Sequence, residues 1–61
     1  MNITTEQPTT GNFIQLWTFN NHIWALECKW EDDKLLHYDE ESDKWLKHEG
    51  YGPEPTHYVV Q

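Results

Sequence analysis

Four histidines and a single cysteine are the side chains of this chain best suited to bind a transition metal. In a folded sheet His37 could lie near Cys28, and His48 could approach His57. Zinc sites usually contain close pairs such as Cys-x2-Cys or His-x3-His, whereas the spacings here are irregular. We therefore expect no metal and no other cofactor, with three histidines exposed and one at the edge of the core.

Nucleophilic catalysis would need a cysteine whose thiol pKa is lowered by nearby positive charge. The predicted surroundings of Cys28 are apolar and acidic, and both features raise a thiol pKa. Cys28 is therefore expected to be a buried structural residue. Because it is the only cysteine, no internal disulfide can form.

Clustered carboxylates can bind calcium or hydrolyse glycosides, but the spacing here fits neither activity. An EF-hand loop needs acidic residues at alternate positions around a central glycine, which the segments EDDK (31–34) and DEESDK (39–44) lack. Paired catalytic carboxylates need a concave cleft, which a sheet this small can hardly form. We expect that the protein is not an enzyme.

Seven of the eleven carboxylates fall between residues 31 and 43, where Lys34 is the only lysine or arginine. These seven are Glu31, Asp32, Asp33, Asp39, Glu40, Glu41 and Asp43. The sequence predicts that they occupy two turns and form one acidic rim. Charged turns keep small β-proteins soluble and prevent edge pairing, which is one interpretation of the rim. The other is that the carboxylates imitate nucleic-acid phosphates and bind a basic groove on a DNA- or RNA-handling protein.

Aromatic residues beside the predicted turns could anchor such a contact, because aromatic side chains dominate many protein interfaces. Trp30, Tyr38 and Trp45 complete the predicted partner-binding set. The net charge of −7 and the absence of arginine argue against direct nucleic-acid binding. The proline-containing segment 51–55 could also be read by a partner, or it could simply connect two strands.

With 61 residues, the chain is expected to form one small domain whose core is only marginally sufficient. Its nine aromatic residues (four Trp, three Tyr, two Phe) compensate by burying large areas. No apolar run approaches the roughly 20 residues of a membrane span, and the N-terminus lacks the features of a secretory signal. We expect a cytoplasmic protein that makes no membrane contact.

Turn signals recur every eight to ten residues from Phe13 onward and separate segments rich in β-branched and aromatic residues. They predict a mainly β domain at 13–61, preceded by a flexible N-terminal arm at 1–12 that Ile3 could pin down. The domain is expected to be a small antiparallel meander, curled or partly barrel-like. Its five strands are predicted at about 13–19, 22–30, 34–38, 44–48 and 56–60.

The first predicted hairpin turns at Asn20-Asn21, because asparagine tolerates positive φ. This turn pairs Phe19 with His22 and Trp17 with Trp24, and it opposes Gln15 to Leu26 and Phe13 to Cys28. A three-residue loop at 31–33 would put Leu36 and Tyr38 on the face of Cys28, and a longer loop would invert that assignment.

A four-residue turn at 40–43 opposes Asp39 to Lys44 and Tyr38 to Trp45, although 39–48 could instead form a short helix. The face opposite Cys28 is apolar and needs cover, which favours a homodimer. The predicted self-association residues on that face are Ile14, Leu16, Ile23 and Ala25, with Leu35 and Leu46 as possible additions.

The last 26 residues before Gln61 read LLHYDEESDKWLKHEGYGPEPTHYVV. This order resembles a family of short phage-encoded domains of unknown function, in which a Tyr-Asp strand end, an acidic turn, a Trp and a terminal Thr-His-Trp strand follow one another. Tyr38-Asp39, Trp45 and Thr56-His57-Tyr58 occupy the similar places, but Tyr58 stands where that family has Trp, and the trailing Met-Pro-Leu-Pro is missing. The resemblance implies a small β-rich fold and a viral accessory context, and it transfers no activity or site.

These observations leave three functional hypotheses, of which a metal-dependent or catalytic role is the least favoured. The first is a phage-type accessory protein that binds and inhibits a host protein in the host cytoplasm through its acidic rim. The host protein could be a defence or nucleic-acid-handling enzyme. The second is a structural or assembly subunit that self-associates through the apolar sheet face.

Overall fold

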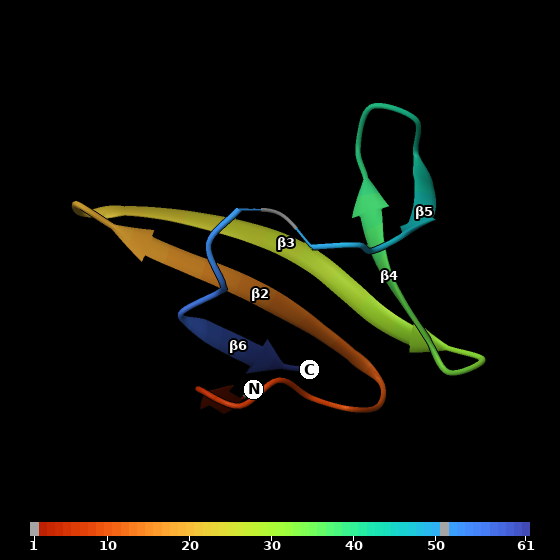
Figure 1. Cartoon of the computed structure of the whole chain (residues 1–61), viewed down its shortest axis with the longest axis horizontal. Helices are drawn as coiled ribbons and strands as arrows, with labels where there is room; N and C mark the ends of the chain where they lie inside the picture. The colour runs from red at the N-terminus through yellow and green to blue at the C-terminus, as the bar shows by residue number, and fades with distance from the viewer. Residues whose placement is uncertain (1, 51) are drawn as a thin grey trace.

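A computed structural model describes residues 2–50 and 52–61, and these form one six-stranded antiparallel sheet (Figure 1). Its strands are β1 (Asn2–Thr4), β2 (Asn12–Phe19), β3 (His22–Glu31), β4 (Lys34–Asp39), β5 (Lys44–Lys47) and β6 (His57–Val60). The spatial order is β1-β6-β2-β3-β4-β5, so the sheet curls but stays open. The predicted all-β meander is confirmed. The alternative helix at 39–48 is wrong, because the turn and β5 occupy that segment.

The predicted arm contains a sixth strand that the sequence did not indicate. β1 pairs with β6, with Ile3 opposite Val59, and this pairing places the two chain ends side by side (Figure 1). Further along the arm, the indole Nε1 of Trp30 donates a hydrogen bond of 2.9 Å to the carbonyl oxygen of Pro8. The arm is therefore attached to the sheet at both points.

The β2–β3 hairpin has the predicted register along its whole length, from Phe19 opposite His22 to Phe13 opposite Cys28. Asn20 and Asn21 form the two-residue turn, with φ of 46° and 66°. Asparagine reaches this left-handed region because its short side chain can hydrogen-bond locally. Local turn chemistry and alternation of side chains therefore agree on one register.

The β3–β4 connection differs from the sequence prediction, because it is a two-residue turn. Asp32 and Asp33 both have positive φ (53° and 62°), and Glu31 lies directly opposite Lys34. The three-residue loop is therefore wrong, and Leu36 and Tyr38 lie on the face opposite Cys28. A pair of aspartates can replace the usual glycine, since aspartate also tolerates the left-handed region.

The four-residue β4–β5 turn is confirmed, with Asp39 opposite Lys44 and Tyr38 opposite Trp45. This register places Leu46 opposite His37, while the preceding turn places Leu35 opposite Trp30. Both leucines consequently share the face of Cys28. Their suggested place in the self-association face is wrong.

The core lies on the face of Cys28, where Phe13, Cys28 and Tyr58 are buried together. Leu26, Trp30 and Leu35 pack around them. The rings of Phe13 and Tyr58 meet edge to face with centroids 6.0 Å apart, a geometry that aromatic pairs prefer. The connection from β5 to β6 crosses in front of β3 (Figure 1), and Thr56 joins it to β2 by a backbone hydrogen bond of 2.8 Å to Leu16.

Candidate functional site

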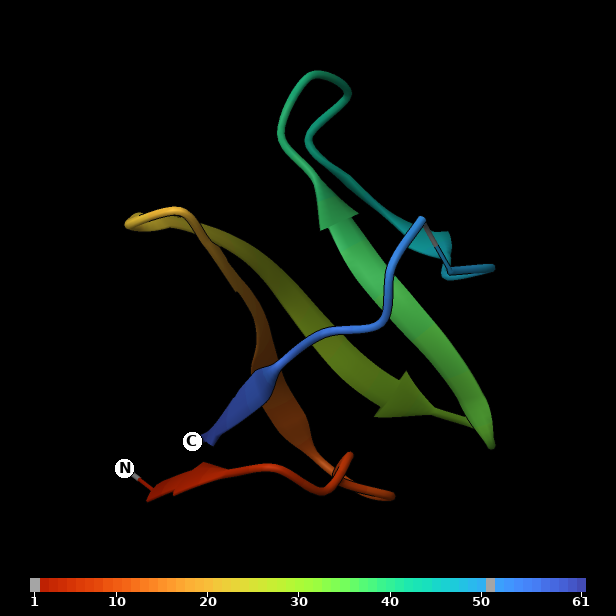
Figure 2. The ribbon, with the colours of Figure 1, turned by 60° about the vertical axis from the view of Figure 1, so that its left-hand side comes forward.

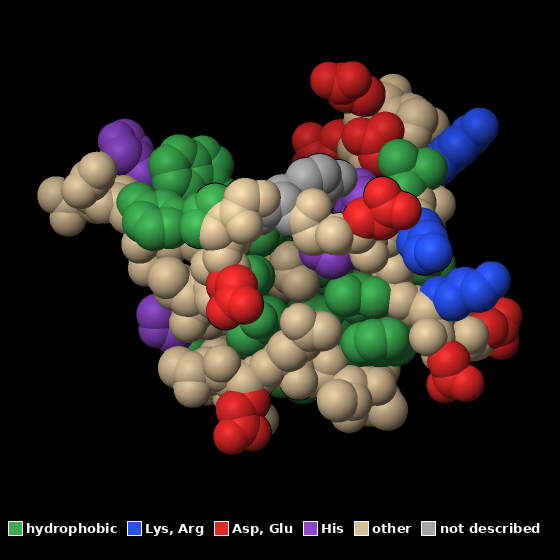
Figure 3. All heavy atoms as spheres, viewed as in Figure 1, with side chains coloured by type: hydrophobic (Ala, Val, Ile, Leu, Met, Phe, Trp, Pro, Cys, Tyr) green, Lys and Arg blue, Asp and Glu red, His purple; other side chains and the backbone are tan. Residues whose placement is uncertain are grey.

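The seven predicted carboxylates do not form one rim, because the fold divides them between two corners. One group lies at the β3–β4 turn and the other at the β4–β5 turn, and β4 runs between the two turns. The six residues of β4 separate them by about 20 Å at roughly 3.3 Å per residue. In Figure 3 the acidic side chains accordingly appear in separate groups above and below on the right. Successive turns of a meander lie at opposite ends of their shared strand, which is the reason for the difference.

The β3–β4 corner is partly neutralised by lysines. Lys29 Nζ lies 3.0 Å from a carboxylate oxygen of Glu31, and Lys34 lies opposite Glu31 in the register. Lys29 also lies 4.5 Å from the ring centroid of Trp45. Exposed ion pairs contribute little free energy, but here they reduce the net negative charge of the corner. Trp30, predicted to anchor a partner at this corner, instead packs on the core and binds Pro8.

The β4–β5 corner keeps more of its negative charge, because Lys44 opposite Asp39 is the one lysine set against its four carboxylates. It also keeps two of the predicted aromatic anchors. Tyr38 and Trp45 pack edge to face with ring centroids 5.5 Å apart. The Tyr38 hydroxyl donates a hydrogen bond to the carboxylate of Asp43, and the Ser42 hydroxyl donates one of 2.7 Å to Asp39. These contacts order the turn and leave Glu40 and Glu41 exposed at its tip.

The surroundings of Tyr38 at this corner raise the pKa of its hydroxyl. The hydrogen bond to Asp43 raises that pKa first, followed by desolvation and by the charges of Asp43, Glu40 and Glu27. Because Glu27 belongs to β3, carboxylates from two separate elements act on the same hydroxyl.

A groove of ≈ 520 Å³ lies between β3 and the β4–β5 hairpin, and we call it the acidic groove. Figure 2 shows the β2–β3 and β4–β5 hairpins diverging above the shared lower part of the sheet. Apolar residues and carboxylates contribute equally to its lining, which consists of Ile14, Ala25, Leu26, Glu27, Tyr38, Asp39, Glu40 and Glu41. The groove thus unites part of the predicted partner-binding set with part of the predicted self-association set. Sequence reasoning missed Glu27, which looked like an ordinary exposed strand position.

The predicted self-association residues do share one face of the sheet. Leu16 lies opposite Ala25, and Ile14 opposite Glu27 on the same face. Ile23 is 69% exposed and Ile3, on the neighbouring part of this face, is 70% exposed. Ile14 and Leu16 are half-buried, so the exposed apolar area is concentrated at the ends of the face.

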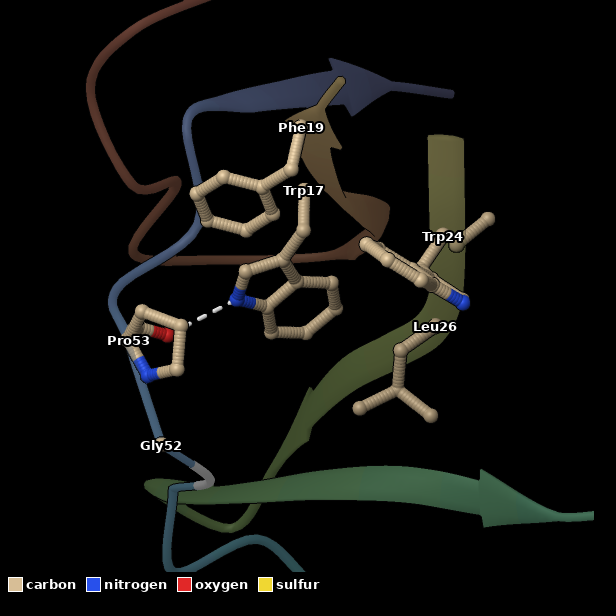
Figure 4. A pocket seen from close by; sticks show the side chains of 7 residues that line it. Trp17, Phe19, Trp24, Leu26, Gly52 and Pro53 are labelled. Atoms are coloured by element: carbon tan, nitrogen blue, oxygen red, sulfur yellow. Dashed lines mark hydrogen bonds between the residues drawn. The ribbon is translucent and has the colours of Figure 1, made fainter. Parts of the chain in front are cut away.

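A second, apolar cleft of ≈ 530 Å³ lies on the core face near the β2–β3 turn. Its lining includes Trp17, Phe19, Trp24 and Pro53, and the Trp17 indole lies between Pro53 and Trp24 (Figure 4). The Trp17 indole donates a hydrogen bond of 2.8 Å to the carbonyl oxygen of Pro53. Within the proline-containing segment 51–55, which could be read by a partner or simply connect two strands, Pro53 is thus bound by the chain itself. Tyr51 lies outside the described residues.

The histidines are less exposed than predicted, because only His22 is fully exposed. His37 is buried opposite Cys28, and its Nδ1 lies 3.3 Å from Nδ1 of His48. Burial, and secondarily the charge of His37, lowers the pKa of His48. In the part of the chain that the structure describes, no three His, Cys, Asp or Glu side chains are placed to hold a metal ion.

Cys28 is buried, as predicted, and burial raises the pKa of its thiol to about 11. Such a thiol is protonated near neutral pH and is a poor nucleophile. Cys28 therefore acts in packing.

Comparison with protein-family models, with curated proteins and with solved structures finds no match for this chain. Within the described residues, no helix is long and apolar enough to cross a membrane.

Proposed function

We propose that this chain binds a basic surface of another protein through the acidic groove and the β4–β5 turn, and inhibits that protein by covering the surface. The acidic groove carries the proposal, because it places Glu27, Glu40 and Glu41 beside the apolar side chains of Ile14 and Ala25. Protein interfaces commonly combine an apolar centre, which supplies affinity, with charges that steer association.

The distribution of charge supports a basic partner. The chain has a net charge of −7 and only four basic residues, all of them lysine. Among the described residues, no lysine lines the acidic groove. Long-range attraction would therefore direct a cationic surface to this side of the molecule.

We propose that the chain inhibits its partner by imitating nucleic acid, and that only the carboxylates of the β4–β5 corner take part in this imitation. Asp39, Glu40, Glu41 and Asp43 crowd a single turn, whereas duplex DNA carries one charge per roughly 1.7 Å of its axis. Such a turn would replace a few phosphates in a basic cleft. The resemblance of residues 35–60 to phage-encoded domains directs the proposal to a host enzyme that handles nucleic acid or acts in defence, in the host cytoplasm.

A charge-reversal experiment tests this proposal. A partner captured from a host lysate at low salt would be titrated with the wild-type chain and with the double variant E40K/E41K. We expect the variant to bind at least about tenfold more weakly, and the affinity of the wild type to fall steeply with ionic strength.

The matched control is E6K/E54K, which makes the same change in net charge at two exposed residues outside the acidic groove. A control that weakens binding as much as E40K/E41K would show that only total charge matters. Equal affinity of E40K/E41K and the wild type would contradict the proposal directly.

The exposure of Ile23 and Ile3 supports a second candidate, self-association through the face of Ile14, Leu16, Ile23 and Ala25. It predicts a solution mass near twice the 7.4 kDa of the chain, unchanged or increased at high salt. A monomeric mass at high micromolar concentration would eliminate this candidate.

A further inference from the structure

One half of β3 has no neighbouring strand on its outer side. β3 extends from His22 to Glu31, but its pairing with β4 covers only Cys28 to Glu31. From His22 to Leu26 the strand pairs with β2 alone. We call this stretch the open edge. In Figures 1 and 2, β4 turns away from β3 at this level and leads into the β4–β5 hairpin.

The direction of the backbone groups on the open edge follows from the register. Trp30 donates its backbone N–H to Gly11, on the β2 side, at 3.0 Å. Hydrogen-bonding direction alternates along an antiparallel strand, so Trp24 and Leu26 also face β2. The N–H and C=O groups of Ile23 and Ala25 therefore point outward. Within the described part of the chain, no backbone partner outside the strand pairs is found for either residue.

The open edge lacks several of the features with which natural proteins protect such edges. Between Ile23 and Leu26 it has no proline, no charged side chain and no β-bulge. Gly52 and Pro53 of the β5–β6 connection border the apolar cleft together with Ala25 and Leu26, on the core face of the sheet. Ile23 is 69% exposed and Trp24 is 56% exposed. Ala25 also lines the acidic groove, so its outward backbone groups border the same groove as the carboxylates of Glu27 and Glu40.

We propose that the open edge binds an extended, basic segment of the partner as an added antiparallel or parallel strand. Backbone groups of the segment bond to Ile23 and Ala25, and its lysine or arginine side chains face Glu27, Glu40 and Glu41. Main-chain pairing supplies affinity in this mode of recognition, and alternate side chains supply specificity. The inference rests on the proposed function for the positive charge of the partner, and it adds the place and manner of binding.

Charge also favours a basic segment over a second copy of this chain as the occupant of the open edge. A second copy on the same edge would bring a second set of groove carboxylates towards Glu27, Glu40 and Glu41. Like charges directly across strands are destabilising. A basic segment converts the same carboxylates into attractive contacts.

The test uses a short peptide of alternating lysine and valine as the probe, and a second peptide of the same sequence that is N-methylated at alternate residues. N-methylation removes backbone donors and keeps every charge. We expect the unmodified peptide to bind at least about tenfold more tightly than the methylated one. On binding it should slow amide hydrogen exchange at Ile23 and Ala25 in the wild-type chain.

A variant of the chain gives the complementary measurement. A25P removes the outward N–H without breaking a bond to β2, and proline is tolerated on edge strands. We expect A25P to bind the unmodified peptide about tenfold more weakly than the wild type does. A25S keeps the N–H, so it should bind the peptide with the affinity of the wild type.

The outcomes separate this inference from the proposed function. Equal binding of both peptides, together with loss of binding in E40K/E41K, would overturn strand addition and leave the basic partner in place. No binding of either peptide at low salt would overturn strand addition, and the titration of the captured partner with E40K/E41K would then decide the proposed function separately. Protection of Ile23 and Ala25 that grows with protein concentration and without peptide would assign the edge to a second copy, and it would also overturn the inference.

Discussion

Asp33 offers a sharp test of the local geometry, because its φ of 62° lies in the left-handed region. Alanine in that region is strained by about 1–2 kcal/mol, whereas glycine is not. At an ordinary strand position the order is reversed, since glycine is about 0.5–1 kcal/mol less favourable than alanine. The sign of the difference between D33G and D33A therefore reports the backbone conformation of residue 33. Both variants remove the same charge, so electrostatics cancel.

We expect D33G to be more stable than D33A by about 1 kcal/mol. For a chain of this size that difference corresponds to about 4–8 °C in melting temperature. Thermal unfolding followed by tryptophan fluorescence measures both variants under identical conditions. If D33A melts at a higher temperature than D33G, residue 33 is not in a left-handed turn. The register of β4, and with it the position of Tyr38 on the acidic groove, would then be incorrect.

Three further predictions concern the core, the β5–β6 connection and the cysteine. F13A removes a side chain that is 1% exposed and should lower the free energy of unfolding by about 3–5 kcal/mol. That is much of the total of roughly 3–9 kcal/mol expected for a chain of this length. A denaturant midpoint near that of the wild type would contradict the assigned core. W17F removes the 2.8 Å hydrogen bond to Pro53 and should cost about 1 kcal/mol. Amide exchange should become faster at Thr56, whose backbone N–H ties the same connection to Leu16; unchanged exchange would contradict the role of the Trp17 bond. The folded-state pKa of Cys28 is raised from 9.0 to about 11, so its contribution to stability is complete below pH 9 and is lost as the pH rises to about 11. The pKa values of Tyr38 and Tyr58 are raised as well, so unfolding curves measured across that window should show a smaller loss in C28A than in the wild type; an equal loss would contradict the role of Cys28.

Much of the sheet could be predicted because local and global signals agree. Asn20-Asn21 selects a two-residue turn, and the alternating residues of β3 then have only one register that buries Phe13 against Cys28. The β3–β4 turn was less predictable, since Asp32 and Asp33 tolerate several loop lengths. Side-chain packing selects the two-residue turn, because the resulting register of β4 buries His37 and places Leu35 against the core. β1 is too short to show an alternating pattern.

The candidate site was predicted only in part, for a different reason. The sequence identifies the carboxylates but not their separation, which depends on the direction of β4 between its two turns. It also gives no sign that β3 and β4 separate beyond Cys28 and His37. That separation creates both the acidic groove and the open edge, and it is a property of the curled sheet as a whole.

Chemical-shift mapping of the backbone amides during titration with the lysine–valine peptide tests the central claim most directly. The account predicts shifts that are largest at residues 23–27 and 38–41, the two sides of the acidic groove, and that disappear in E40K/E41K. Shifts concentrated at residues 31–34, or spread evenly over every exposed carboxylate, would contradict it.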